Sequence, residues 1–235
     1  MVQGAVVVEE APKPEIRVLE TGDTYGRFAL EPLEPGYGIT LGNPMRRVLL
    51  TSVPGNAVTW IKIEGTLHEF STIPHMKEDV AEFLINVKAI RLKSLAERPG
   101  KLRLEIAREG EVTAGDIIVS TDFEIVNPEL HLATMESAEG RLSVEFNVEQ
   151  GKGYVPAGGT DGLSIGVLPV DAIFSPVRKV HYAVENTRVG QITNYERLVL
   201  DVWTDGTVSP VDAVKKGAEV LLEQLFLFAN ADKAG

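Results

Sequence analysis

Hydrophobic residues recur at two different spacings along the chain, and each spacing predicts a kind of element. Apolar residues at every second position predict strands near both ends, over 16–20, 27–31, 179–185 and 197–204. The same alternation predicts five strands in the middle, over 58–64, 101–107, 123–126, 131–135 and 141–150. We therefore expect a fold in which short strands dominate and a few helices interrupt them.

A segment that ends at Ser52 changes to the 3.6-residue spacing of an amphipathic helix. Its apolar face carries Leu41, Met45, Val48 and Leu49. Asn43 and Pro44 make a good N-cap and first-turn pair, yet Leu41 already fits the helical spacing. Either the helix begins late, or Pro44 lies within its opening turns.

Arg47 and Leu50 project together from the side of this helix opposite its apolar face. Arginine is enriched at protein interfaces, so an exposed leucine beside it is typical of a surface that docks a large protein partner. The alternative is that the stem of Arg47 covers Leu50 as part of the chain's own core.

A second long helix is predicted near the end of the chain, with Ser209 as N-cap, Pro210 as first residue and Asp212 completing a capping-box-like start. Its stripe contains Val214, Ala218, Leu221, Leu225 and Phe228; Val211, Leu222 and Ala229 widen it, and Val220 and Leu227 lie on the other flank. Such an arc is wider than one sheet covers, which predicts self-association with the first helix contributing. The alternative is a helix inside the chain's own core.

A shorter apolar stripe in the middle of the chain predicts a third helix, through Val80, Phe83, Leu84 and Val87. It lies behind start signals at Ser71, Thr72 and Pro74, with Glu78 and Asp79 favourable near its positive end. The strand-rich region around it, residues 53–174, is predicted to be an inserted domain. Residues 15–52 and 175–235 then form one discontinuous dimerisation domain of antiparallel strands and two main helices, and residues 1–14 a flexible arm. The fold class expected is α+β.

Composition narrows the function. The chain has 34 acidic and 23 basic residues and a net charge of −11, which works against direct binding of nucleic acid. It contains no cysteine, which suits a reducing cytoplasm, and we expect a cytoplasmic location because no export signal or membrane-length apolar run is present.

The motifs of catalytic and metal sites are incomplete. His68-Glu69 begins like a zinc-protease helix, but Thr72 occupies the position of the second histidine, and the remaining histidines are isolated in sequence. The glycines around Lys152 lack the pattern of a phosphate-binding loop. We expect no catalytic residue, no metal and no cofactor in this chain.

One long segment nevertheless resembles a known family. Residues 30–52 read Leu-Glu-Pro-Leu-Glu-Pro-Gly-Tyr-Gly-Ile-Thr-Leu-Gly-Asn-Pro-Met-Arg-Arg-Val-Leu-Leu-Thr-Ser, and the similarity continues through 53–55, 67–72, 151–157 and 170–177 in the same order. This series resembles the N-terminal region of the bacterial-type RNA polymerase alpha subunit, from about Arg17 to Ala229. The resemblance favours the longer first helix.

The resemblance implies a homodimer on which RNA polymerase assembles, with one protomer receiving the beta subunit and the other beta-prime. Carried over by position, Arg47 and Leu50 correspond to beta docking, and Lys88 and Val170 to beta-prime docking. Alpha subunits generally continue into a C-terminal DNA-binding domain, whereas this sequence stops at Gly235. We therefore expect it to reach nucleic acid only through the assembled polymerase.

Two other classes of function remain as alternatives. One is a homodimeric small-molecule-binding protein that uses the strand-rich middle as a pocket, and the other is a carboxylate-dependent hydrolase. Co-purification separates the three, because a platform brings down two very large subunits, a binding protein a metabolite, and a hydrolase turns over substrate alone.

Overall fold

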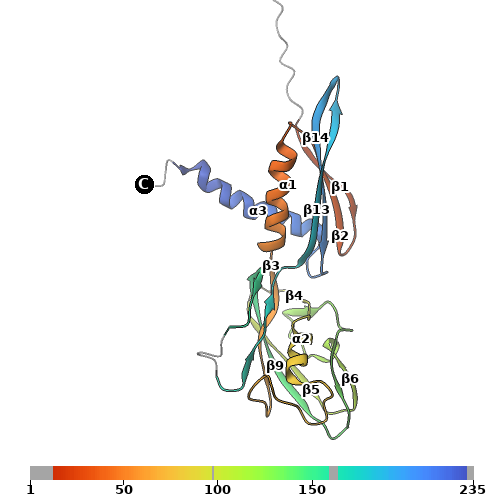
Figure 1. Ribbon diagram of the computed structural model, residues 1–235, viewed down its shortest axis with the longest axis vertical. Helices are drawn as coiled ribbons and strands as arrows, with labels where there is room; N and C mark the ends of the chain where they lie inside the picture. The colour runs from red at the N-terminus through yellow and green to blue at the C-terminus, as the bar shows by residue number, and fades with distance from the viewer. Residues whose placement is uncertain (1–12, 97, 159–163, 232–235) are drawn as a thin grey trace, which may run out of the picture.

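The computed structural model describes residues 13–96, 98–158 and 164–231. It has a mixed, strand-rich α+β fold with antiparallel sheets, as the hydrophobic spacing predicts. Two bodies follow one another along the long axis of the molecule (Figure 1). The terminal body is built from the two ends of the chain, and the central body from the residues between them. Of the predicted arm over 1–14, residues 1–12 lie outside the described residues.

The terminal body contains one four-stranded antiparallel sheet. Its strands are β1 (Glu15–Thr21), β2 (Tyr25–Leu33), β13 (Val177–Val189) and β14 (Ile192–Thr204), in the order β1-β2-β14-β13. The hairpin at the start of the chain joins the hairpin near its end through β2 and β14, for example at Phe28 and Leu200. Residues far apart in sequence therefore complete one sheet.

Helix α1 (Tyr37–Thr51) packs on the β13–β14 side of this sheet and contains Pro44 in its interior. Of the two alternative starts predicted for this helix, the earlier one, which places Pro44 inside the helix, is therefore the correct one. Its start is set by Gly36, whose φ of 90° is a left-handed conformation that favours glycine. The asparagine–proline pair is not the boundary, because the backbone is already helical from Tyr37, about two turns before Pro44.

Helix α3 (Pro210–Ala229) starts as predicted. The Ser209 hydroxyl accepts a hydrogen bond from the backbone N–H of Asp212 at 3.1 Å and donates one to its carboxylate at 2.7 Å. Its first half lies over α1, where Gly217 leaves room for the side chain of Leu49. Its second half extends away from both bodies (Figure 1).

The central body is organised around a larger antiparallel sheet in the order β5-β9-β3-β4-β7, with β11 paired to β3. The bounds are β3 Pro54–Ile63, α2 Val80–Val87, β4 Leu92–Ser94, β5 Gly100–Ile106, β6 Gly110–Thr113, the short 3-10 helix η1 Ala114–Asp116, β7 Phe123–Ile125, β8 His131–Met135, β9 Leu142–Lys152, β10 Tyr154–Val155, β11 Val167–Pro169 and β12 Ala172–Ile173. Strands β6 and β8 form one separate pair and β10 and β12 another.

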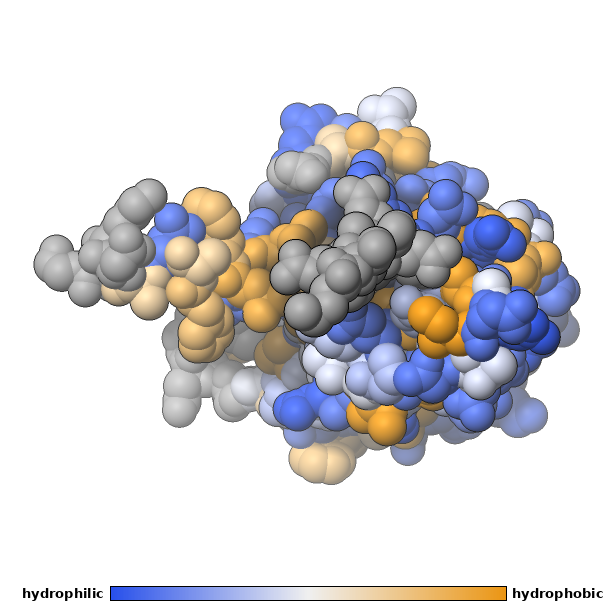
Figure 2. Space-filling model, turned by 90° about the horizontal axis from the view of Figure 1, so that it is seen from above, coloured by the Kyte–Doolittle hydropathy of each residue, from blue (hydrophilic) through white to orange (hydrophobic). Residues whose placement is uncertain are grey.

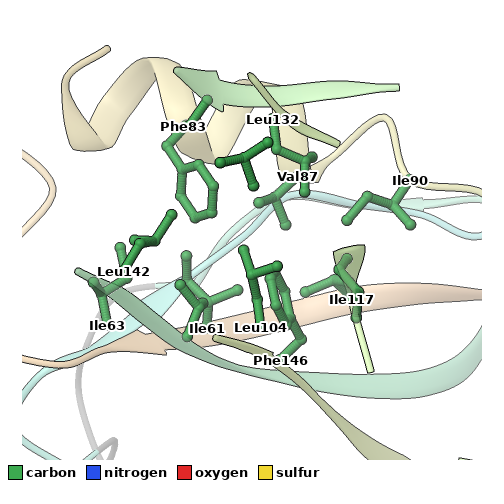
Figure 3. Close-up of a cluster of buried hydrophobic side chains, with 14 of the residues drawn as sticks. Ile61, Ile63, Phe83, Val87, Ile90, Leu104, Ile117, Leu132, Leu142 and Phe146 are labelled. Carbon is green, nitrogen blue, oxygen red and sulfur yellow. The ribbon is translucent and has the colours of Figure 1, made fainter. Parts of the chain in front are cut away.

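Helix α2 covers the central sheet and closes its core. Phe83 and Val87 point from the helix toward Ile61, Leu104 and Phe146 on the sheet (Figure 3). The predicted stripe is confirmed, and so is the place of Asp79 at the positive end of the helix, but the signals at 71–74 do not start it. The Asp79 carboxylate caps the helix by accepting from the backbone N–H of Glu82 at 2.8 Å, and the preceding residues form turns instead.

Candidate interaction surfaces

Helix α1 has one side in the core and one side in solvent. The side chain of Leu49 is fully buried against the sheet and α3, and Arg47 is exposed on the opposite side. The predicted direction of Arg47 is thus correct. The Thr51 hydroxyl donates to the carbonyl of Arg47 at 2.9 Å, so the last turn that carries this arginine is held in a regular helical geometry.

Leu50 differs from its predicted exposure. Its side chain is partly buried and packs against the same hydrophobic cluster as Leu49, because it lies on the flank of the helix rather than opposite the core. Its carbonyl accepts a hydrogen bond from the Ser175 hydroxyl at 3.0 Å. A partner at this surface would therefore meet an exposed arginine, Arg47, and only the solvent-facing part of Leu50.

The second half of α3 carries a large uncovered apolar surface. Leu222 is 65% exposed, Phe226 66% and Phe228 80%. Figure 2 shows hydrophobic residues gathered along this projecting end of the helix. Monomeric proteins rarely leave such contiguous apolar area in water, and each of these side chains is worth about 1.5 to 3 kcal/mol when buried.

The residues predicted to form a dimer interface fall into three groups. Leu49 and Val214 are buried inside the chain's own core, so the prediction that they face a second copy is wrong. Those that are partly exposed are Leu41, Met45, Val48, Ala218 and Leu221. Leu225 and Phe228 are exposed, at 60% and 80%.

Phe226 was not predicted as part of this surface. The signal was available in the sequence, because Leu225 to Phe228 are four consecutive apolar residues and therefore surround the helix instead of following one face. A helix that is apolar on every side needs cover on every side.

Lys88 lies in an organised polar cluster on the central body. Its ammonium is 2.7 Å from the Asp171 carboxylate and 5.4 Å from the centre of the Tyr154 ring. The other oxygen of Asp171 accepts from the backbone N–H of Ala157 at 2.8 Å. That backbone hydrogen bond and the Lys88 ammonium hold the pKa of Asp171 at about 2.

Val170 is next to this cluster in sequence but is only 5% exposed, because it packs in the core of the central body. Its side chain therefore offers little surface of its own, and its link to beta-prime docking stays a prediction. At this place Tyr154 is exposed, and Lys88 and Asp171 are partly exposed. A cleft of about 510 Å³ opens beside them, with Trp60, Pro156 and Phe174 among its lining residues.

His131 lies between two carboxylates of the central body. Its Nε2 lies 3.0 Å from Glu78 and its Nδ1 3.0 Å from Glu111. Glu78, only 7% exposed, also accepts from the backbone N–H of Thr134 at 2.7 Å. Among the described residues, no three histidine, aspartate or glutamate side chains are grouped to hold a metal ion.

These hydrogen bonds shift the pKa of both partners. Burial lowers the pKa of His131, but the hydrogen bonds to Glu78 and Glu111 outweigh it and raise the pKa above its ordinary value. Burial raises the pKa of Glu78, and the hydrogen bonds from Thr134 and His131 outweigh that effect and lower it. The pair is therefore more stable with both groups charged.

Within the described part of the chain, each helix is too short or too polar to cross a membrane.

Comparison with known proteins relates both bodies to RNA polymerase subunits. Residues 61–175 match the family of the RNA polymerase Rpb3/RpoA insert domain. The DNA-directed RNA polymerase subunit alpha of Moorella thermoacetica is 53% identical over 221 residues, which cover 93% of this chain and 70% of that protein. The subunit alpha of Carboxydothermus hydrogenoformans is 53% identical over 226 residues, covering 95% of this chain and 72% of that protein.

A match over nearly the whole chain takes in the motif at residues 30–52 and both hairpins of the terminal sheet. The resemblance predicted from the sequence is confirmed: the chain belongs to the family of DNA-directed RNA polymerase alpha subunits.

Proposed function

We propose that this chain is a non-catalytic, homodimeric platform on which the beta and beta-prime subunits of RNA polymerase assemble. As a member of the alpha family it is a component of the polymerase. The observation that carries the proposal is the uncovered apolar end of α3, which a single chain cannot shield. The relatives give no support to a small-molecule-binding protein.

The dimer in this proposal forms through α1 and α3 of two copies. The two helices contact each other within one chain, so the partly exposed Leu41, Met45 and Val48 continue into the surface of α3. The exposed end of α3 then reaches across to the equivalent surface of the second copy. A specific dimer buries about 1,200 to 2,000 Å² in total, which two such helix pairs can supply.

In this arrangement the terminal body, residues 15–52 and 175–235, is the dimerisation domain and residues 53–174 are the inserted domain. The separate hydrophobic clusters of the two bodies support this division. Beta docks at Arg47 and the adjoining edge of Leu50. Beta-prime docks at Lys88 and its neighbours, with Val170 supporting that surface from the core.

Arg47 suits the role of an anchor because its exposed guanidinium can make forked, charge-assisted hydrogen bonds to carboxylates or carbonyls. Removing it costs the fold little, since its side chain is in solvent. Truncating an interface anchor commonly costs about 2 kcal/mol in binding, which weakens association more than tenfold.

The test is the capture of beta by purified dimers of Arg47→Ala and of a matched control, Arg46→Ala. Both arginines are exposed neighbours on α1, so the two variants lose the same charge from the same helix. We expect Arg47→Ala to lose beta capture at least tenfold with an unchanged melting temperature, and Arg46→Ala to keep most of it. Equal capture by wild type and Arg47→Ala would refute the docking assignment.

A further inference from the structure

Helix α1 begins without a side-chain cap of its own. Gly36 has no side chain to accept a hydrogen bond, and the first turn contains no acidic residue. The backbone N–H of Gly36 donates instead to Oε1 of Glu196 at 2.9 Å, and that of Gly38 to Oε2 at 2.8 Å. One carboxylate on strand β14, distant in sequence, thus binds two N–H groups of the helix start.

Two glycines let α1 approach the sheet closely enough for this contact. A Cβ atom on Gly38 would lie 2.7 Å from Val184 and 2.8 Å from the Glu196 carboxylate. A Cβ atom on Gly42, one turn later, would lie 2.6 Å from the Tyr182 ring. All three distances are shorter than real Cβ contacts, so larger residues at either glycine would lift the helix off the sheet.

The two oxygens of Glu196 therefore fix the helix in two respects. They stabilise the positive end of its dipole, as any carboxylate there would. They also tie that end to one place on β14, because each oxygen is bound to a different N–H group. Arg47 lies nine residues after Gly38, about 14 Å along the same helix, so a shift or rotation of the helix at its start changes where its guanidinium points.

We propose that Glu196 is a positioning residue for large-subunit docking: it sets the place of α1 on the sheet and so the place of Arg47. This inference rests on the proposed function and adds a residue that touches no partner. It also explains why a glycine stands at position 38, since a side chain there would keep the Glu196 carboxylate from reaching the helix.

The experiment must separate positioning from simple stabilisation of the helix. Glu196→Gln removes the charge and one acceptor. Adding Ile39→Glu restores a carboxylate to the first turn at an exposed position, but on the helix itself, where it cannot tie α1 to β14. Melting temperature, dimer mass and beta capture are measured for both variants beside wild type and Arg47→Ala.

We expect Glu196→Gln to remain a dimer, to melt at a lower temperature and to capture beta about tenfold more weakly. The double variant should recover the melting temperature and not the capture. Recovery of both by Ile39→Glu, or full capture by Glu196→Gln, would overturn the inference. If Arg47→Ala also captures beta normally, the docking assignment itself has failed, so the two failures are distinguishable.

A second variant tests the same idea without changing any charge. Gly38→Ala improves the helix propensity of α1 but places a methyl group against Val184 and Glu196. We expect beta capture to fall although the intrinsic helix preference rises. Undiminished capture by this variant would count against positioning by Glu196.

Discussion

Helices α2 and α3 both carry strongly apolar stripes, yet the chain covers only one of them. Phe83 of α2 is fully buried between the helix and the central sheet (Figure 3), whereas Phe228 of α3 is 80% exposed at the end of a projecting helix (Figure 1). The apolar spacing of a helix therefore shows that one of its faces must be buried. The length of the helix relative to its sheet shows whether the chain's own sheet or another molecule buries that face. The eight residues of α2 fit on their sheet, and the twenty of α3 do not.

The largest expected effect is a loss of stability when the buried face of α2 is truncated. Phe83→Ala leaves a cavity in the central core, which costs about 3 to 5 kcal/mol of unfolding free energy. The control is Ile85→Ala on the same helix, where a 68% exposed side chain should change stability by less than about 0.5 kcal/mol. Denaturant unfolding measures both. Similar losses for the two variants would show that α2 is covered differently from Figure 3.

The next effect concerns association rather than folding. Replacing Leu225 and Phe228 with glutamate puts two charges on the exposed end of α3, and we expect monomers at concentrations where wild type is a dimer. The matched control changes Leu95 and Ile118 to glutamate, two side chains of the central body that are each 61% exposed. Sedimentation gives the masses. A dimer that survives the α3 substitutions would remove the main support for self-association.

The smallest effect is a pH dependence tied to the segment before α2. The pKa of His131 is raised in the folded protein, so its stabilising contribution is fully present below pH 6.5 and is lost as the pH rises through the folded value. The side chain is 40% exposed, which limits the loss to less than about 1 kcal/mol. Between pH 6 and 8 the melting temperature should fall more for wild type than for His131→Gln.

Dimer mass in the same pH range should not change, because the exposed surface of α3 is apolar. The opposite result, a dimer mass that changes with pH and a melting temperature that does not, would contradict both assignments. Titration would then act on the dimer contact of α3 and not on the stability of the central body. Parallel curves for wild type and His131→Gln would show that the Glu78–His131 contact adds nothing to stability.

Of the two long helices, α3 starts on neighbouring residues and its start could be predicted from the sequence, whereas α1 starts on a distant residue and its start could not. The start of α3 was predicted because Ser209, Pro210 and Asp212 are adjacent. The start of α1 could not be settled by local signals because its cap, Glu196, comes from the far end of the chain. The side of the helix occupied by Arg47 followed from the 3.6-residue period alone.

Burial was predicted less well for single residues than for whole faces. Leu50 lies at the border between the core and solvent sides of α1, where a small rotation decides its exposure. Val170 follows β11 in the chain, and only the three-dimensional core of the central body shows that its side chain is enclosed. Position in a family motif identified the region of Lys88 and Val170 but could not say which of the two side chains faces out.

The sheet of the terminal body also has a consequence for the timing of assembly during synthesis. Leu33 pairs with Glu196, so 163 residues separate two strands that lie side by side. At about 5 to 20 residues per second, a ribosome needs roughly 8 to 33 s to make that stretch. Helix α1 is made early but has no sheet to lie on until β13 and β14 emerge. The nascent chain therefore cannot present Arg47 in its final place until β14, which ends at Thr204, has been made.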